Sequence, residues 1–266
     1  MARLVGSDVL VHPVCRDSRV IGLLLAGSKD PRDTQISSFE TQLLDAVADC
    51  IRVFLENADL YADQHALFVG TVEALAAAID AKDRYTCGHS ERVAHLAYQL
   101  ALATGIDETG AERVRISGLL HDIGKIGVPE AILCKPGRLT PQEFDQIKLH
   151  PRMGETILKD IPYLDDILPG VLYHHERLDG KGYPDGLAGD EVPMIARLLS
   201  VADAFDAMSS SRSYRAAMSR EQVLAELRRG AGTQFDPALV ERFLKLDFSK
   251  YDRMVAAHQG LPGLAA

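Results

Sequence analysis

The first 35 residues consist of short apolar runs joined by polar connections. Val9 to Val14 and Val20 to Ala26 are two apolar runs, and the polar stretch 15–19 lies between them. This pattern predicts a short β-hairpin. Because two strands alone are only marginally stable in water, we expect further strands from a partner or from sequence outside this chain.

After residue 36 the spacing of apolar residues changes to alternating steps of three and four. Ser37 and Glu40 have the spacing of a capping box, which marks the start of a helix. Gly70 is the only glycine between residues 37 and 81, where no proline occurs. The pattern predicts one long helix with a coiled-coil seam that forms a homodimer through residues 40–80. The alternative is two amphipathic helices that meet near Gly70. The stripe contains Leu44, Val47, Ile51, Phe54, Ala58, Tyr61, His65, Phe68, Val72, Leu75 and Ile79.

Beyond residue 85 the helical periodicity continues almost to the end of the chain. The predicted fold class is therefore mainly α, an all-helical bundle preceded by the β-hairpin and the long linker helix. The helix that starts at Thr140 is expected to carry His150 near its end, because Pro151 follows. Residues 177–190 are rich in Gly, Asp and Pro and are expected to form a structured loop. Other helices are expected over 90–103 with Gly105 as its C′ residue, over 112–121 and on through Lys125, over 193–211, from Ser219, and last from Asp236.

Composition narrows the classes of function. The chain has 266 residues, of which 47% are hydrophobic and 25% charged, as in soluble globular proteins. Its formal net charge of -9 argues against binding to a nucleic-acid polymer. No apolar run approaches the roughly 18 residues that span a membrane, and no signal peptide is evident. The four cysteines form no CxxC pair, so reduced thiols in a cytoplasmic protein are expected.

The histidines point to metal chemistry. Six of the nine fall between His89 and His175, and His95, six residues after His89, is interpreted as structural. His121-Asp122 pairs an imidazole with a carboxylate, and a carboxylate can bridge two cations in a hydrolytic site. Lys125 follows within one helical turn and is a candidate to hold a phosphate oxygen or to protonate a leaving oxygen. Alone, the pair could equally be a surface histidine beside a capping aspartate.

A second histidine pair and two aspartates extend the set. Adjacent helical residues such as His174 and His175 point roughly 100° apart, which suits a cluster of two metals better than a single ion. Asp203 and Asp206 lie three apart in an otherwise apolar helix, where an unpaired carboxylate is costly. The alternative for Asp203 is an ion pair with Arg197 or Arg212.

Two longer blocks carry a family resemblance. His121-Asp-Ile-Gly-Lys-Ile-Gly-Val-Pro129 and His174-His-Glu-Arg-Leu-Asp-Gly-Lys-Gly-Tyr-Pro184 closely resemble the HD-GYP family of bacterial signalling phosphodiesterases. The resemblance covers about residues 70–245. Further matching blocks are Gly88-His-Ser-Glu-Arg-Val93, Lys135-Pro-Gly-Arg-Leu-Thr140, His150-Pro, Gly186-Leu-Ala-Gly189, Ala202-Asp-Ala-Phe-Asp-Ala207, Arg212-Ser-Tyr-Arg215 and Phe235-Asp-Pro237.

The resemblance implies an all-helical phosphodiesterase that hydrolyses cyclic di-GMP to linear pGpG, with a second cut to GMP. It implies two divalent cations, iron or manganese, with Asp122 bridging them. Water activated by the two cations would attack phosphorus in line, while Lys125 offsets charge on the phosphoryl oxygens. The implied metal ligands are His89, His121, Asp122, His150, His174, His175 and Asp203. The implied substrate-binding residues are Gly182, Tyr183 and Pro184 of the GYP signature, and Asp206, Arg212 and Arg215.

One position departs from part of the family. Members that hold a third metal use a glutamate one turn before the first histidine, and Tyr85 stands there in this chain. Asp83 is six residues before His89, which is poor helical spacing for the same role. We therefore expect a two-metal centre, for which complete conversion to GMP is an open question.

The predicted organisation has three parts. Residues 1–35 resemble the second half of a GAF sensor domain, through Val20-Ile-Gly-Leu-Leu-Leu-Ala-Gly27 and Ser38-Phe-Glu40. Residues 36–69 form the linker helix, and residues 70–266 form the phosphodiesterase domain. Signalling partner proteins and no membrane contact are expected. Two alternatives to a cyclic di-GMP hydrolase stay open: a non-catalytic cyclic dinucleotide receptor or adaptor, and a hydrolase of another cyclic dinucleotide.

Overall fold

The computed structural model describes residues 3–5, 9–27, 36–82, 87–210 and 217–259. Contacts divide the chain into two compact units, residues 1–69 and residues 70–266. The described chain is mainly helical, which confirms the predicted fold class. None of the described helices combines the length and the apolarity that a bilayer crossing needs. All four cysteines are among the described residues and are free.

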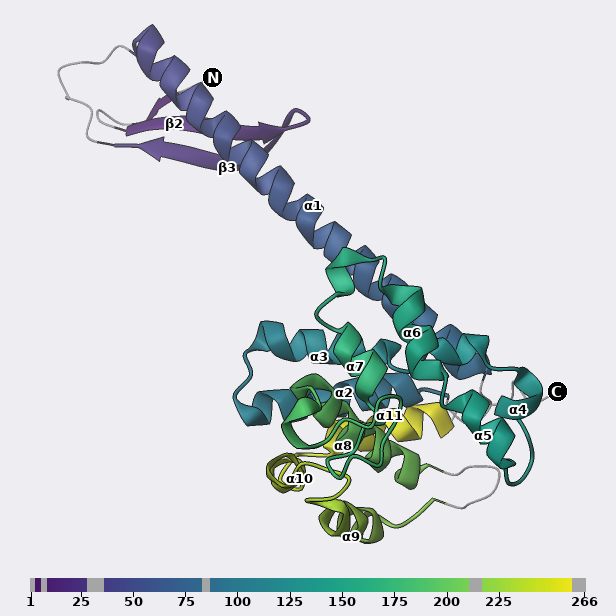
Figure 1. Cartoon of the computed structure of the whole chain (residues 1–266). Helices are drawn as coiled ribbons and strands as arrows, with labels where there is room; N and C mark the ends of the chain where they lie inside the picture. The colour runs from purple at the N-terminus through teal and green to yellow at the C-terminus, as the bar shows by residue number, and fades with distance from the viewer. Residues whose placement is uncertain (1–2, 6–8, 28–35, 83–86, 211–216, 260–266) are drawn as a thin grey trace. The chain divides into compact units, whose positions relative to one another are not determined.

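The first unit contains a three-stranded antiparallel sheet in the order β1-β2-β3 (Figure 1). The predicted hairpin is present as β2 (Val9–Arg16) and β3 (Arg19–Ala26), while β1 (Arg3–Val5) was not predicted. Asp17 and Ser18, with φ of 44° and 66°, form a two-residue connection of the kind that matches strand twist. The strands therefore extend into the stretch that was expected to be the loop.

The long helix α1 (Ser38–Lys82) runs for 45 residues without a break, so the prediction of one continuous helix is confirmed. Its start has the predicted capping box: Glu40 N donates to Ser37 Oγ, and Ser37 N donates to Glu40 Oε2. Within the first unit, Nε2 of His12 in β2 lies 3.0 Å from Oδ1 of Asp45. Leu10, Val14, Leu44 and Ala48 are buried there.

The second unit is a bundle built around helix α2 (His89–Thr104). Its core gathers apolar residues of α2, α3, α8, α9, α10 and α11, with Leu100, Leu198 and Phe205 completely buried. Gly105, with φ of 92°, ends α2 as predicted. The other elements are α3 (Glu108–Leu120), η1 (Ile123–Gly127), α4 (Glu130–Leu133), α5 (Pro141–Ile147), α6 (His150–Leu158), η2 (Pro162–Leu164), α7 (Leu168–Tyr173), η3 (Gly189–Glu191), α8 (Met194–Ser209), α9 (Arg220–Gly230), α10 (Pro237–Phe243) and α11 (Ser249–Gln259).

Three expectations about helix limits are wrong. His150 begins α6 and does not end α5, because Pro151 occupies the first turn of α6, where its missing N–H costs nothing. The helix before His121 ends at Leu120, so Asp122 and Lys125 lie in a turn and in the short 3-10 helix η1. Helix α10 is followed by a further helix, α11.

Helix η1 crosses α6 at glycine positions, and this contact sets where Asp122 and His150 meet. A Cβ atom on Gly124 would overlap the carbonyl oxygen of His150. Gly124→Ala is therefore expected to lower the free energy of unfolding by about 3 kcal/mol or more, the upper end for overpacking. Urea unfolding followed by circular dichroism measures the effect.

Gly70→Ala provides the matched control, since no atom lies within 4 Å of a Cβ atom built there. Gly70 is exposed in the interior of α1, where alanine should stabilise the helix by about 0.5–1 kcal/mol. Equal stability of the Gly124→Ala variant and the wild type would contradict the close packing of η1 on α6.

Candidate metal centre

Three histidines donate a hydrogen bond to the last turn of the helix that precedes each of them. Nδ1 of His121 is 2.7 Å from the carbonyl oxygen of Gly118 in α3, and Nδ1 of His150 is 2.7 Å from that of Ile147 in α5. Nδ1 of His174 is 2.8 Å from the carbonyl oxygen of Val171 in α7. Carbonyls at helix C-termini lack an intrahelical donor, so they are available acceptors. Because a carbonyl only accepts, each Nδ1 carries a proton, which leaves Nε2 as the ring nitrogen that can ligate a metal.

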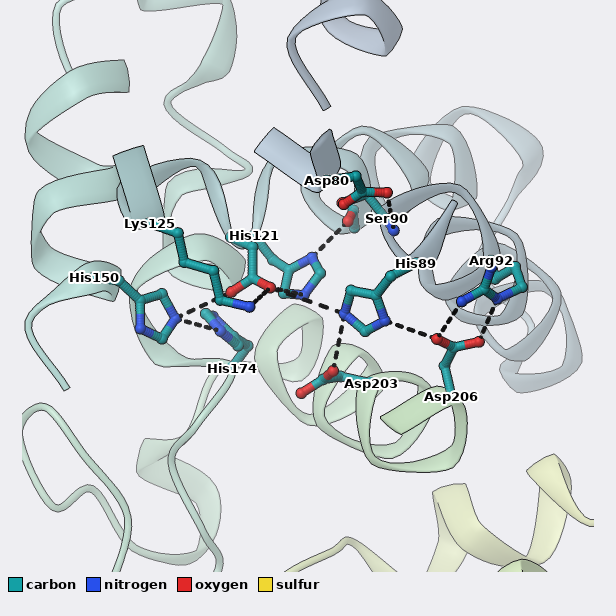
Figure 2. A network of polar contacts seen from close by, with 12 residues as sticks. Asp80, His89, Ser90, Arg92, His121, Lys125, His150, His174, Asp203 and Asp206 are labelled. Atoms are coloured by element: carbon teal, nitrogen blue, oxygen red, sulfur yellow. Dashed lines mark hydrogen bonds and ion pairs between the residues drawn. The ribbon is translucent and has the colours of Figure 1, made fainter. Parts of the chain in front are cut away.

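The Nε2 atoms of these three rings point into one buried space. Nε2 of His121 is buried and has no hydrogen-bond partner among the described residues. Nε2 of His150 lies 3.3 Å from Nε2 of His174 (Figure 2). A buried imidazole nitrogen without a hydrogen-bond partner is unfavourable unless a cation binds it. The donor set therefore fits divalent metal ions.

Asp122 stands between two groups of possible ligands. Its Oδ1 lies 3.2 Å from Nε2 of His150, whereas its Oδ2 lies 3.5 Å from Nε2 of His121 and 3.8 Å from Nε2 of His89. Each carboxylate oxygen thus faces a different group, as a bridging carboxylate does. Within each group the ligand atoms lie within 4.8 Å of one another; the groups are Asp122, His150, His174 and His175, and His89, His121 and Asp203.

The structure therefore brings all seven predicted metal ligands together. Burial, with smaller contributions from neighbouring imidazoles, lowers the pKa of His175 to about 3 and moves that of His174 in the same direction. Both rings are neutral at physiological pH, the form in which imidazole binds metals. Arg197 pairs with Asp190 and Asp236, so the alternative of an Arg197–Asp203 ion pair is not observed.

His89 begins α2 and is held between two carboxylates. Its Nε2 lies 3.3 Å from Oδ1 of Asp203, and its Nδ1 lies 2.7 Å from Oδ2 of Asp206. Burial opposes charge on the ring, but the hydrogen bonds to Asp203 and Asp206 raise the pKa of His89 to about 10. In the metal-free protein an imidazolium neutralises these carboxylates; a bound cation would serve the same purpose and leave the ring neutral.

Asp206 lies behind His89 and not on the surface of a pocket. It is completely buried, and its oxygens accept hydrogen bonds from His89, from Nε and Nη2 of Arg92, and from the hydroxyl of Tyr251. Burial opposes ionisation, yet His89 and Arg92 hold its pKa below the usual range. The sequence placed Asp206 among the substrate contacts, but this geometry suits a residue that orients His89.

Lys125 reaches the centre from η1. Its Nζ is 2.6 Å from Oδ2 of Asp122, and its side chain is 15% exposed. Burial opposes the negative charge on Asp122, but Lys125 and the neighbouring histidines lower the pKa of this carboxyl well below its usual range. The ammonium therefore lies against the carboxylate whose oxygens face the two ligand groups.

The GYP signature packs against the turn that carries the two adjacent histidines. A Cβ atom on Gly182 would lie 2.5 Å from Cα of Glu176, so this close approach requires glycine. The ring of Tyr183 is 4.7 Å from that of His175, and its peptide bond to Pro184 is cis. Oε1 of buried Glu176 accepts from the backbone N–H groups of Asp185 and Gly186 and fixes the end of the loop.

A cavity of about 430 Å³ opens beside the centre. Its wall combines possible metal ligands with aromatic and cationic side chains, which suits an anionic ligand that carries rings. The lining includes His174, His175, Asp203, Phe144, Tyr183, Lys148, Arg177, Lys181 and Gln234.

Some predicted residues are not part of this description. Arg212, Arg215, Tyr85 and Asp83 lie outside the described residues, so their predicted roles stay predictions. His95 is nearly buried, and in neither of the two ligand groups, in agreement with its structural interpretation.

Arg92, Glu176 and Tyr251 are buried residues of the site that were missed from the sequence. Arg92 and Glu176 lie within the quoted blocks. The available signal was an ionisable residue close in sequence to a candidate ligand histidine. Tyr251 lies in α11, far from every block, and gave no such signal.

Metal addition is expected to stabilise the protein. Treating chelated protein with Mn²⁺ at about 100 times its dissociation constant should add about 2.7 kcal/mol. For a domain of this size that corresponds to a rise of roughly 5–10 °C in Tm. Differential scanning calorimetry measures the shift. A His121→Gln/His174→Gln variant is the control and should show little response; an equal rise in that variant would contradict the assignment of the cation to these nitrogens.

Comparison with known proteins identifies the helical unit. The family model described as HD domain matches residues 73–239. The chain is 40% identical over 177 residues to the cyclic di-GMP phosphodiesterase response regulator RpfG of Xanthomonas campestris, covering 66% of this chain and 47% of the relative. It is 34% identical over 232 residues to 3'3'-cGAMP-specific phosphodiesterase 2 of Vibrio cholerae, covering 86% of this chain and 44% of the relative.

A solved structure shares the fold. The cyclic GMP-AMP specific phosphodiesterase of Vibrio cholerae superposes with a TM-score of 0.53 at 16% identity, over 71% of this chain and 50% of that chain. The chain spans about half the length of the curated relatives it matches.

Proposed function

Because the chain belongs to the HD domain family, we propose that it is a metal-dependent phosphodiesterase of the HD-GYP type that hydrolyses cyclic di-GMP to linear pGpG. The observation that carries the proposal is Asp122, whose two oxygens face two separate groups of histidines and aspartate. A cavity with aromatic and cationic walls lies directly beside these groups and supports a nucleotide substrate. The same oxygen that faces His121 also pairs with Lys125.

A pair of divalent cations, when bound, supplies Lewis acidity for phosphodiester hydrolysis. The protein's own contribution begins with orientation: carbonyl acceptors fix His121, His150 and His174 with Nε2 inward. Lys125 offsets negative charge on a phosphoryl oxygen or gives a proton to the leaving oxygen. Lys181 gives the cavity wall positive charge for the substrate phosphates, whereas the guanidinium of Arg177 is paired with Asp179.

The assay that tests the function uses protein loaded anaerobically with Mn²⁺ or Fe²⁺. Incubation with cyclic di-GMP and chromatography of the nucleotides should yield pGpG, and a later GMP peak would reveal a second cut. Metal analysis of the same sample should find two ions per chain, since the described ligands form two groups. Absence of turnover with either metal rules out the proposal, and nucleotide binding without turnover favours a receptor.

A second substrate, 3'3'-cGAMP, is supported by one observation. The relative whose alignment covers 86% of this chain is specific for that dinucleotide. Two guanines and a guanine–adenine pair differ in their hydrogen-bonding edges, which the rings and amide lining the cavity would read. Measuring kcat/KM for both dinucleotides in parallel decides between them.

The proposal includes a homodimer through residues 40–80. Leu44, Val72 and Ile79 of the predicted seam are buried within the chain, whereas Phe54 and Tyr61 are 72% and 74% exposed. The exposed stripe around Phe54 and Tyr61 is therefore the part left to pair with a second copy. Light scattering at tens of micromolar should report a dimer, and Phe54→Glu/Tyr61→Glu should convert it to a monomer.

The remaining parts of the proposal concern context. The β segment of residues 1–35 is taken as the end of a GAF-like sensor, since β3 exposes Val20, Leu23 and Leu25 to further partners. Signalling proteins are the class of partner expected there. A cytoplasmic location is proposed because four free cysteines suit a reducing compartment.

A further inference from the structure

The last turn of α1 contacts both segments that carry the two groups of metal ligands. Asp80 is 6% exposed and lies against the start of α2, where His89 is the first residue. Lys82, two positions later, lies against η1, which follows Asp122. These contacts are within the second unit, and neither residue belongs to the seven candidate ligands.

Asp80 caps the N-terminus of α2, whose own N-cap residue has no side chain to do so. The N-cap residue of α2 is Gly88, which has no side chain to accept from the first turn. Oδ2 of Asp80 accepts from the backbone N–H of Ser90 at 3.2 Å, and Oδ1 accepts from the Ser90 hydroxyl at 2.7 Å (Figure 2). A carboxylate at a helix N-terminus also faces the positive end of the helix dipole. Asp80 therefore fixes the backbone next to His89.

Lys82 caps a helix C-terminus, that of η1. Its Nζ donates to the carbonyl oxygens of Lys125, Ile126 and Val128 at 3.1, 2.7 and 2.9 Å. The last carbonyls of a short helix lack intrahelical donors, and an ammonium has three N–H groups to offer. Lys82 therefore binds the C-terminal end of η1 through three hydrogen bonds. This short helix follows Asp122 and includes the backbone of Lys125.

From these contacts we propose that Asp80 and Lys82 are positioning residues that set the spacing between His89 and Asp122. The two ligand atoms, Nε2 of His89 and Oδ2 of Asp122, are 3.8 Å apart and belong to segments 33 positions apart in sequence. One helix turn holds both segments through charge-assisted hydrogen bonds. Displacement of that turn would change the separation of the two ligand groups and the position of Lys125 together.

The test uses the variants Lys82→Met and Asp80→Asn, with Lys82→Arg as the conservative change that keeps the positive charge. Arg113→Met is the matched control, because Arg113 also anchors a backbone carbonyl, that of Tyr163, and pairs with Asp166 away from the centre. Each chelated protein is titrated with Mn²⁺ in a calorimeter. Thermal unfolding, kcat and KM are measured on the loaded proteins.

Lys82→Met and Asp80→Asn are expected to weaken binding of one Mn²⁺ equivalent, and to lower kcat, by about 10–100-fold, the usual cost of losing a supporting partner. KM should change little, Lys82→Arg should recover part of the loss, and Arg113→Met should affect thermal unfolding only. The proposal is overturned if Lys82→Met and Asp80→Asn behave like Arg113→Met. Should Lys82→Met not fold, Lys82→Arg and Asp80→Asn decide alone.

The turnover readout rests on the proposed function, but the titration does not. If the wild type binds Mn²⁺ and hydrolyses no cyclic dinucleotide, the proposed function fails, and the isotherms of the variants still decide the positioning proposal.

Discussion

Replacing Asp122 with asparagine is expected to lower phosphodiester turnover by more than about 10³-fold, beyond the roughly 10–100-fold cost of losing a partner outside the ligand set. Asparagine keeps the shape of the side chain but removes its charge and replaces one oxygen with an NH₂ group that cannot ligate a cation. Since the two oxygens of Asp122 face different ligand groups, either orientation of the amide breaks one of the two contacts. Bound metal should fall below two equivalents per chain.

The variant also removes the charged group that faces Lys125. Nζ of Lys125 lies 2.6 Å from Asp122 and is largely buried, so the neutral amide removes its counter-charge. Asp166→Asn is the control, because Asp166 pairs with Arg113 outside the centre. Metal analysis, circular dichroism and the cyclic di-GMP assay on both variants are the measurements. Retention of two metals with wild-type turnover in Asp122→Asn would refute the bridging assignment.

The chemical nature of the centre was predictable because short blocks of sequence encode it. His121-Asp122 and His174-His175 are neighbours in the chain, and Asp203 stands out as a carboxylate in an apolar helix. Periodicity and capping signals predicted α1 and the starts of α5 and α9 for the same reason, since each depends on residues within one turn. The seven candidate ligands do meet in space.

The supporting contacts were not predictable, because their partners are distant in sequence. Asp206 is bound by Arg92 and Tyr251, and Lys82 by carbonyls more than 40 residues away. A sequence pattern places a residue on a helix face, but it does not say which other element covers that face. For that reason Asp206 was predicted to contact substrate, whereas its carboxylate is enclosed behind His89.

Local chain geometry also decides details that periodicity misses. Helix α3 ends at Leu120, and Gly124 then approaches the backbone of His150 within a 3-10 helix. In this 3-10 helix the side chain of Lys125 contacts Asp122, which precedes it by three residues. From the sequence, Lys125 was expected to lie near Asp122 on one face of an α-helix. The two side chains do make contact, but Lys125 belongs to a 3-10 helix.

Lys125→Met is expected to lower kcat by about 10²–10³-fold, as loss of one charge-stabilising donor does. Metal content should stay near two equivalents, because Lys125 is not among the ligand groups and methionine preserves most of the side-chain volume. Lys245→Met, at an exposed lysine of a surface ion pair, is the control and should match the wild type. Loss of metal in Lys125→Met would show instead that Lys125 acts only by holding Asp122.

The choice of substrate separates the two roles open to the Lys125 ammonium. With bis(p-nitrophenyl) phosphate the leaving p-nitrophenolate needs no proton, whereas the ribose oxygen of a cyclic dinucleotide does. If Lys125 protonates the leaving oxygen, the defect of Lys125→Met should nearly vanish with the activated ester. If Lys125 offsets charge on the phosphoryl oxygens, the defect should persist at about 10²-fold with both substrates, since both develop that charge. Nζ contacts the carboxylate that faces both ligand groups, between which the proposed reaction would hold the phosphoryl group, so we expect the second outcome.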